Sequence, residues 1–321
     1  MTSKMQEKSL QTFLAELKQK LLTDAVAYQN TILIVIDGMG YHQMKNIYPC
    51  DFLKTCLPSS TVPATTLLRT GLSPEEAGLY GWSQYFHQTN EIVEVFTNTN
   101  ITNNQKSQLP TEPLNTIETI TTQLNKQQKI KAFEIMQFFN KEDSLDAWSE
   151  RILTATKQSH KKYIYAYWYK LDSIAHTFGV NSKQYQHHIK EIFLCLKTLM
   201  SKLPPSTEIL ITADHGLIDT NPIFIDDYPE IASMLETPIF LEPRYTAFKV
   251  KKEFRNIFEK RFNIDGFKIE KSKNEATGDF IAIAVKSYAL YQRGYTKPNK
   301  AEHGSITKEE QDVPLLRIYK K

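Results

Sequence analysis

The 321-residue chain has little that is typical of a secreted, membrane-spanning or nucleic-acid-binding protein. It has only three cysteines, Cys50, Cys56 and Cys195, an odd number without the spacing of a metal-binding knuckle. This number and spacing predict reduced thiols and a cytoplasmic protein, with a Cys50–Cys56 pair as the alternative. No apolar run approaches the roughly 20 residues that cross a membrane. The net charge of +3 is too small to predict a stable complex with nucleic acid.

Residues 1–24 carry apolar side chains at helical spacing, with lysines between them. The pattern predicts an amphipathic surface helix rather than a secretory signal, because it has no continuous apolar region and no small-residue cleavage site. A helix lying on a membrane is the alternative. Glu7, Glu16 and Asp24 count against it because they dilute the positive charge.

Farther along, β-branched apolar runs alternate with helical patterns, which predicts an α/β fold with a mostly parallel central sheet and helices on both faces. The predicted strands are Thr31–Ile36, Glu91–Phe96, Lys129–Ile135, Tyr163–Trp168 and Glu208–Thr212. The predicted helices are Leu114–Leu124, Ser144–Gln158 and Ser182–Leu203. The polar stretch Asn98–Thr111 is typical of an exposed loop.

Residues 221–293 have a different pattern, which predicts a small inserted α+β unit. Its expected elements are strands at Tyr245–Val250, Phe267–Glu270 and Phe280–Ala289 and a helix at Glu253–Phe262. The core would then comprise residues 25–220 and 294–321. Because recognition elements are commonly loops and insertions on a rigid scaffold, we expect this unit to form a lid over a site in the core.

Carboxylate and imidazole side chains follow the ends of the predicted strands. Asp37 ends the first strand and precedes Gly38, and glycine permits the tight turn that projects a carboxylate from the carboxyl edge of a sheet. Asp214 and His215 follow a later strand and precede Gly216. Adjacent residues of a strand point to opposite faces, so both can reach one site only from a turn.

Two further positions extend this set. Asp172 and His176 are four residues apart, which places both on one face of a helix where they can hold one ion. Such a pair is equally typical of a stabilised helix start. His303, between Glu302 and Gly304, is a lone histidine, a type that is usually structural. Together with a hydroxyl-rich turn at residues 58–63, these carboxylates and imidazoles are what two-metal phosphoryl transfer requires.

In chain order, these motifs resemble those of the alkaline phosphatase superfamily, specifically its nucleotide pyrophosphatase/phosphodiesterase family. In that family a Pro-x-x-Thr turn precedes a helix and a Thr-Gly-Leu-x-Pro segment. Here the corresponding residues are Pro58–Thr61 and Thr70–Pro74. The resemblance implies an alkaline-phosphatase-like core and a nucleophile at Thr61, whereas a shift of one residue would place the nucleophile at Ser60.

The resemblance also implies two metal ions. One would be held by Asp172, His176 and His303, and the other by Asp37, Asp214, His215 and the Thr61 oxygen. Nitrogen and oxygen ligands without cysteine favour zinc, with manganese as the alternative. Coordination would activate the threonine hydroxyl as a nucleophile, and the resulting phospho-threonine would then be hydrolysed by activated water.

The family pattern is not followed after the nucleophile helix. Aligned without gaps, Trp82 occupies the position of an asparagine that donates to a phosphate oxygen, and Ala77 that of a histidine. The Thr61 backbone N–H or a side chain such as Gln84 would have to supply the contact. The expected preference for diesters over monoesters is weaker for this reason.

Substrate contacts are predicted at three positions. Trp82 and Tyr85 lie in an aromatic segment that would stack on a nucleobase or, alternatively, form core beneath the insertion. Arg244 opens an inserted strand and would contact a phosphate or, alternatively, lie on the surface.

The sequence therefore predicts a hydrolase of phosphodiester or nucleotide pyrophosphate bonds that acts on a small phosphate ester or nucleotide. A phosphomonoesterase of the same superfamily is the nearest alternative. A non-catalytic binding protein of the same fold is the other, and loss of ligand residues would be its signature. None of the seven ligand positions is lost.

Overall fold

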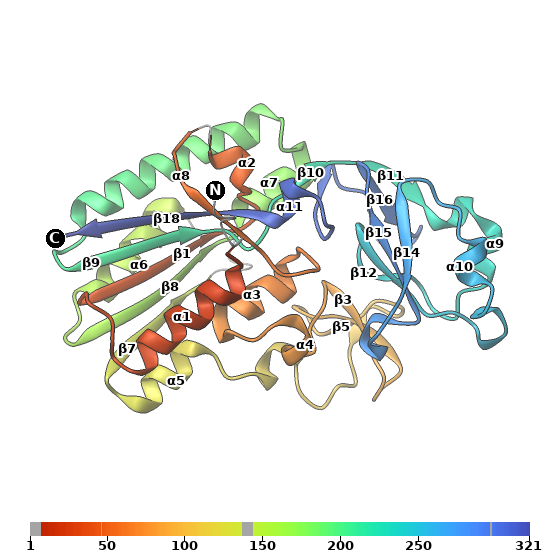
Figure 1. The fold of residues 1–321 in the computed structure, drawn as a ribbon, viewed down its shortest axis with the longest axis horizontal. Coiled ribbons are helices and arrows are strands. Elements are labelled where there is room, and N and C mark those ends of the chain that lie inside the picture. Colours follow the sequence, from red (N-terminus) through yellow and green to blue (C-terminus); the bar gives the residue numbers. More distant parts are fainter. Residues whose placement is uncertain (1–7, 46, 137–143, 296) are drawn as a thin grey trace, which may run out of the picture.

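The computed structural model describes residues 8–45, 47–136, 144–295 and 297–321, so the first seven residues of the predicted N-terminal helix lie outside it. A central sheet with helices on both faces forms one half of the molecule, and a second sheet forms the other half (Figure 1). The predicted α/β fold class is confirmed.

The central sheet has the strand order β2-β18-β9-β1-β8-β7. Its four parallel strands are β1 (Asn30–Ile36), β7 (Ile130–Ile135), β8 (Lys161–Trp168) and β9 (Thr207–Thr212). β18 (Asp312–Lys320) pairs with β9 in the antiparallel sense, and β2 (Asp51–Lys54) pairs antiparallel with β18 at the edge of the sheet. Every residue of β1 is buried, as its run of β-branched side chains on both faces predicts.

Helices pack on the two faces of this sheet. One layer contains α1 (Leu10–Leu22), α3 (Thr61–Thr70) and α5 (Ile120–Gln127), and the other contains α6 (Leu145–Thr156), α7 (Lys170–Phe178) and α8 (Lys183–Lys202) (Figure 1). The apolar face of α1 is buried in the protein core, as the amphipathic pattern predicts. Within the described ranges, no helix is both long and apolar enough to cross a bilayer.

The second sheet is antiparallel and has the order β14-β15-β13-β12-β3-β4-β5-β6. Its strands are β3 (Ser83–Phe86), β4 (Glu91–Glu94), β5 (Thr99–Asn100), β6 (Gln105–Lys106), β12 (Phe240–Glu242), β13 (Tyr245–Phe248), β14 (Phe267–Lys271) and β15 (Phe280–Ala284). Residues 83–106 thus share one sheet with strands of the segment 221–293. The division of the chain into a core and an inserted lid stays a prediction.

Two expectations for residues 91–111 were wrong. The predicted strand Glu91–Phe96 is β4 of this second sheet rather than a strand of the parallel sheet, and the expected loop Asn98–Thr111 contains the short pair β5 and β6. Asn90, Asn98 and Asn104 have positive φ, so left-handed asparagines reverse the chain between these short strands.

Three other predicted elements are each divided in two. Leu114–Leu124 becomes a 3-10 turn at Pro113–Thr116 followed by α5, and Glu253–Phe262 becomes a turn at Lys252–Phe254 followed by α10 (Phe258–Arg261). The last predicted strand becomes β15 and β16 (Tyr288–Tyr291). The short elements that complete the description are α2 (Tyr41–Met44), α4 (Pro74–Ala77), β10 (Ile218–Asp219), β11 (Asn221–Phe224), α9 (Pro229–Ser233), β17 (Ala301–Glu302), α11 (Lys308–Gln311) and 3-10 turns at Ile225–Asp227 and Glu275–Thr277.

Candidate active site

The candidate ligands converge because β1, β8 and β9 are parallel neighbours whose carboxyl ends lie at one edge of the sheet. Asp37 directly follows β1, and Asp214 follows β9. β8 leads into α7, which carries Asp172 and His176 one turn apart. His303 arrives from a distant part of the chain, directly after β17.

Asp37, Asp214 and His215 form one group whose ligand atoms all lie within 4.8 Å of one another. His215 Nε2 is 3.4 Å from Asp37 Oδ1 and 3.8 Å from Asp214 Oδ2. The Thr61 hydroxyl lies 3.0 Å from the same His215 nitrogen. Two carboxylates, an imidazole and a hydroxyl therefore point toward one position, which is the second ligand set that the resemblance implies.

The outward-facing atoms of these side chains are held by the protein. The backbone N–H groups of Gly38 and His215 donate to Asp214 Oδ1 at 3.2 and 2.9 Å, and the Tyr167 hydroxyl donates to Asp37 Oδ2. His215 Nδ1 donates to the Gly216 carbonyl at 3.2 Å, so Nε2 is the ring nitrogen that faces the other candidate ligands. Gly216 is required here because a Cβ at this position would lie 2.1 Å from the Glu309 carbonyl oxygen.

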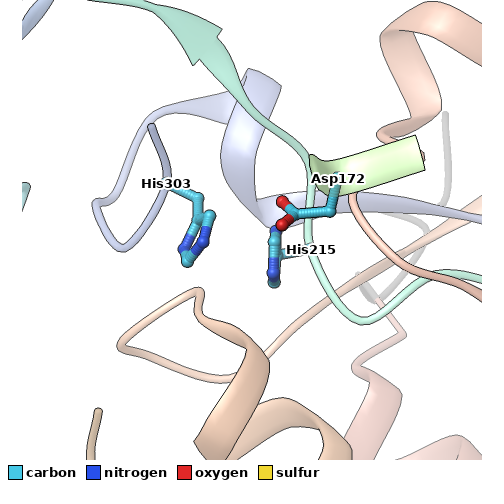
Figure 2. Close-up of side chains that lie close together, drawn as sticks. All are labelled: Asp172, His215 and His303. Carbon is cyan, nitrogen blue, oxygen red and sulfur yellow. The ribbon is translucent and has the colours of Figure 1, made fainter. Parts of the chain in front are cut away.

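Asp172, His176 and His303 lie beside this group. His176 Nδ1 donates to the Ala301 carbonyl at 2.7 Å, so its Nε2 faces Asp172 Oδ2 at 3.1 Å. The His303 ring lies 3.9 Å from the His215 ring, centroid to centroid, and Figure 2 shows both rings next to the Asp172 carboxylate. By proximity, Asp172 and His303 group with His215, and His176 and His303 group with Glu302.

Three buried atoms at this site have no hydrogen-bond partner among the described residues: Asp37 Oδ1, Asp172 Oδ1 and His303 Nδ1. Buried polar atoms are almost always paired, because leaving them unpaired costs free energy. Oxygen and nitrogen donors that converge and are otherwise unsatisfied fit divalent cations such as zinc or manganese. The residues present therefore fit the metal ions that the motifs imply.

The electrostatics of the site also favour a bound cation. Burial raises the pKa of Asp37 well above its usual range, and the charges of Asp214 and Asp172 raise it further. Burial raises the pKa of Asp214 as well. Burial opposes the charging of His176, but Asp172 and Glu302 raise its pKa to about 10. A divalent ion would remove the repulsion between the carboxylates and allow them to ionise together.

The nucleophile turn contains two neighbouring hydroxyls with different partners. Thr61 is the first residue of α3, and its hydroxyl faces His215. The Ser60 hydroxyl instead donates to the Glu242 carboxylate. Ser59 N–H donates to the Gly304 carbonyl at 3.3 Å, which joins the turn to the loop that carries His303. The structure thus directs Thr61, not Ser60, toward the candidate ligands.

A cavity of about 420 Å³ opens above these residues between the two sheets. Thr61, His176 and His303 line it from the central-sheet half, and Trp82 lines it from the second sheet. Trp82 is 37% exposed, and its indole N–H donates to Glu94 Oε1 at 2.7 Å. The tryptophan is therefore held at the cavity wall with part of its surface accessible.

The other predicted substrate contacts have structural partners instead. Tyr85 is buried, and its hydroxyl pairs with Asn90 Oδ1 at 2.9 Å and with Lys249 Nζ at 2.6 Å. The Gln84 amide is buried within its own turn, where it binds the Tyr80 N–H and the Gly78 carbonyl, both at 2.8 Å. Neither side chain lines the cavity.

Arg244 is neither on the surface nor at the cavity. Its side chain is fully buried, and it makes two parallel 2.8 Å contacts with Glu310. Its Nη1 donates to the carbonyls of Lys286 and Tyr288 at 2.9 and 2.6 Å. The guanidinium therefore connects β13 to α11, and the expected phosphate contact is replaced by a buried ion pair.

Three residues near the site were missed by the sequence analysis. Glu242 of β12 lines the cavity and accepts hydrogen bonds from the Ser60 hydroxyl and, at 2.7 Å, from the Trp82 N–H; burial raises its pKa to about 8. Glu302 lies behind His176, and its position next to His303 in the sequence could have indicated it. Tyr167 contacts Asp37, and no motif marks it or Glu242.

The fold and site define an α/β protein whose parallel strands end at a buried cluster of acids and imidazoles that could hold metal ions. More specifically, residues 31–306 match the family model of type I phosphodiesterase / nucleotide pyrophosphatase. The chain belongs to this family and is a phosphodiesterase, as the resemblance implies. No curated protein sequence matches it.

Solved structures similar to this chain include murine ectonucleotide pyrophosphatase / phosphodiesterase 5, with a TM-score of 0.73 and 14% identity over 89% of this chain and 87% of that one. An inactive form of the murine protein in complex with AMP gives 0.73, 13% identity and the same coverage. The human protein gives 0.69 and 14% identity, also over 89% and 87%. At this identity, the structural likeness establishes the fold.

Proposed function

We propose that the protein cleaves phosphodiester or nucleotide pyrophosphate bonds through a covalent phospho-threonine at Thr61, with two divalent metal ions, most consistent with zinc. The observation that carries the proposal is the Thr61 hydroxyl, which lies 3.0 Å from His215 within a group of otherwise unsatisfied ligand atoms. Asp37, Asp214 and His215 would hold one ion with Thr61. Asp172, His176 and His303 would hold the other.

The chain's own residues supply orientation for this chemistry. When bound, divalent ions lower the pKa of a coordinated hydroxyl and stabilise charge on the phosphoryl and leaving oxygens. Thr61 Oγ1 attacks phosphorus, and the bond from phosphorus to the leaving oxygen breaks. Water then attacks the phospho-threonine and restores the hydroxyl. The N-terminus of α3 places backbone N–H groups beside the phosphate, where they stabilise negative charge.

A nucleotide is the substrate class that the cavity supports best. Its volume of about 420 Å³ lies within the range of small-molecule sites, and Trp82 offers an aromatic surface at its wall. The murine relative in complex with AMP is consistent with this choice. A phosphomonoesterase is the second candidate, because Trp82 occupies the position of a phosphate-binding asparagine.

Replacing the nucleophile tests the proposal. Thr61→Ala should lower kcat for bis-(p-nitrophenyl) phosphate by at least ~10³-fold, because the covalent step is lost. Thr66→Ala is the matched control. It makes the same change on the same helix, at a buried hydroxyl without a partner in the described part of the chain.

Ser60→Ala decides the register. We expect Ser60→Ala to retain most activity, since its hydroxyl binds Glu242. Near-wild-type turnover by Thr61→Ala together with a large loss in Ser60→Ala would move the nucleophile to Ser60. Comparing p-nitrophenyl phosphate with its diester then separates monoesterase from diesterase activity.

We also propose that the protein is cytoplasmic. Cys50, Cys56 and Cys195 are all free thiols in the structure, which is consistent with a reducing, cytoplasmic environment. Fractionation of the producing cells, with the protein detected by antibody, tests this assignment.

A further inference from the structure

Tyr167 lies at the point where two ligand-bearing strands meet. It sits near the carboxyl end of β8 and pairs with Val35 of β1, two residues before Asp37. Its side chain is fully buried. The hydroxyl donates to Asp37 Oδ2 and lies 3.5 Å from Asp214 Oδ2. One phenol from β8 thus lies next to the carboxylate that follows β1 and the carboxylate that follows β9.

This contact determines which oxygen of Asp37 is available. Tyr167 holds Oδ2, and Oδ1 is left without a hydrogen-bond partner, facing His215 Nε2 at 3.4 Å. A carboxylate on a turn can otherwise rotate and offer either oxygen, or both. The hydroxyl therefore orients Asp37 as a ligand that uses one defined oxygen.

The contact also addresses the repulsion between the two acids. Asp37 and Asp214 are both buried, and their charges disfavour each other. The backbone N–H groups of Gly38 and His215 hold Asp214, whereas the donor that the structure shows on Asp37 is the Tyr167 hydroxyl. Among the described residues, the Tyr167 hydroxyl thus supports the Asp37 carboxylate, whereas backbone N–H groups support that of Asp214.

We propose that Tyr167 is the positioning residue for the metal ion held by Asp37, Asp214 and His215. It acts through Asp37 and does not touch the substrate. The inference rests on the two-metal site of the proposed function. Loss of a residue that hydrogen-bonds to a metal ligand typically lowers metal affinity by about 10–100-fold. Loss of the Tyr167 hydroxyl should therefore lower the affinity for one of the two ions by that factor.

The test is a calorimetric titration of chelator-treated protein with Zn²⁺, comparing wild type, Tyr167→Phe and Tyr165→Phe. Tyr165 is the matched control, because it lies two residues earlier on the same strand, is equally buried, and its hydroxyl has no partner within the described chain. We expect two binding events in all three proteins. In Tyr167→Phe alone, one event should be about 10–100-fold weaker and the other unchanged.

A double variant shows whether the effect passes through Asp37. Adding Tyr167→Phe to Asp37→Asn should weaken metal binding no further than Asp37→Asn alone, since coupled residues are not additive. Circular dichroism of each apoprotein checks that it is folded. Should Tyr167→Phe not fold, Tyr167→His supplies a second variant with the hydroxyl removed.

The outcomes separate the inference from the proposed function. Two wild-type binding events with an identical Tyr167→Phe isotherm would overturn the role of Tyr167 and leave the two-metal site intact. Fewer than two events in wild type would overturn the two-metal site and, with it, the inference. Equal weakening in Tyr165→Phe would show a general effect of the strand core and would also overturn it.

Discussion

The two sheets contribute to the cavity in different ways. At the edge of the central sheet, buried acids and imidazoles leave ligand atoms unpaired, as at Asp37 Oδ1 and His303 Nδ1. On the second-sheet side, the polar atoms of Trp82 are paired within the protein: the indole N–H with Glu94, and the backbone N–H with Glu242. The central-sheet side of the cavity therefore offers free ligand atoms to metal ions, whereas Trp82 forms a hydrogen-bonded wall on the opposite side.

This difference separates chemistry from recognition. Asp37 and Asp214 follow the ends of parallel strands, and this rigid scaffold fixes the positions of their side chains relative to one another. The wall belongs to a sheet assembled from the segments 83–106 and 240–284, which are far apart in the chain. We therefore expect changes at the wall to alter KM or stability, and changes at the ligands to alter kcat.

The largest expected effect on stability is at the junction of the two halves. Arg244→Ala should lower the free energy of unfolding by about 3–5 kcal/mol, because it leaves the buried Glu310 carboxylate without its partner. Urea denaturation measures this loss. Arg261→Ala is the control: its pair with Glu230 is exposed, and its removal should cost no more than about 1 kcal/mol. Equal effects of the two variants would contradict the structural role of Arg244.

A smaller effect is expected at the wall itself. Trp82→Ala should raise KM for a dinucleotide by about 10–100-fold and leave kcat within a few-fold, since stacking on a base contributes about 1–3 kcal/mol. Trp82→Phe should restore most of the affinity, because it retains an aromatic face. Steady-state kinetics distinguish the outcomes. A fall in kcat without a change in KM would place Trp82 with the catalytic residues instead.

A pH-dependent effect is expected at Glu242, which links the wall to the nucleophile turn. Its pKa is about 8 in the folded protein, raised by burial from 4.5. An acid with a raised folded pKa stabilises less as pH rises, so stability should fall between about pH 4.5 and 8 and then level off. Glu242→Gln cannot ionise and should lack this component.

Thermal unfolding of chelator-treated protein at several pH values checks this prediction. As pH rises from 5 to 8, the melting temperature of Glu242→Gln should increase by a few degrees relative to that of wild type. A difference that is constant with pH would show that Glu242 does not bind a proton in the folded state over this range.

The sequence was a better guide to the central sheet than to the second one. Strand ends marked by Asp37 or Asp214 could be predicted because buried β-branched runs and the following glycines are local signals. The roles of Arg244 and Tyr85 depend on partners, Glu310 and Lys249, that lie 66 and 164 residues away. No local pattern encodes such pairings.

The same contrast explains the residues that were missed. Glu242 stands in a short strand and reaches Ser60 only because β12 pairs with β3 across the junction of the two segments. Tyr167 lies in a predicted strand, and its hydroxyl reaches Asp37 because β1 pairs with β8 in the sheet. Spacing in the sequence predicts neighbours on one element, whereas these contacts join different elements.

The stereochemical course at phosphorus tests the covalent mechanism most directly. A chiral phosphorothioate diester of a nucleotide, hydrolysed in isotopically labelled water, reports whether one or two in-line displacements occur. Attack by Thr61 followed by attack by water inverts phosphorus twice, so the account predicts net retention of configuration. Net inversion would mean that water attacks the substrate directly, and would contradict the phospho-threonine intermediate.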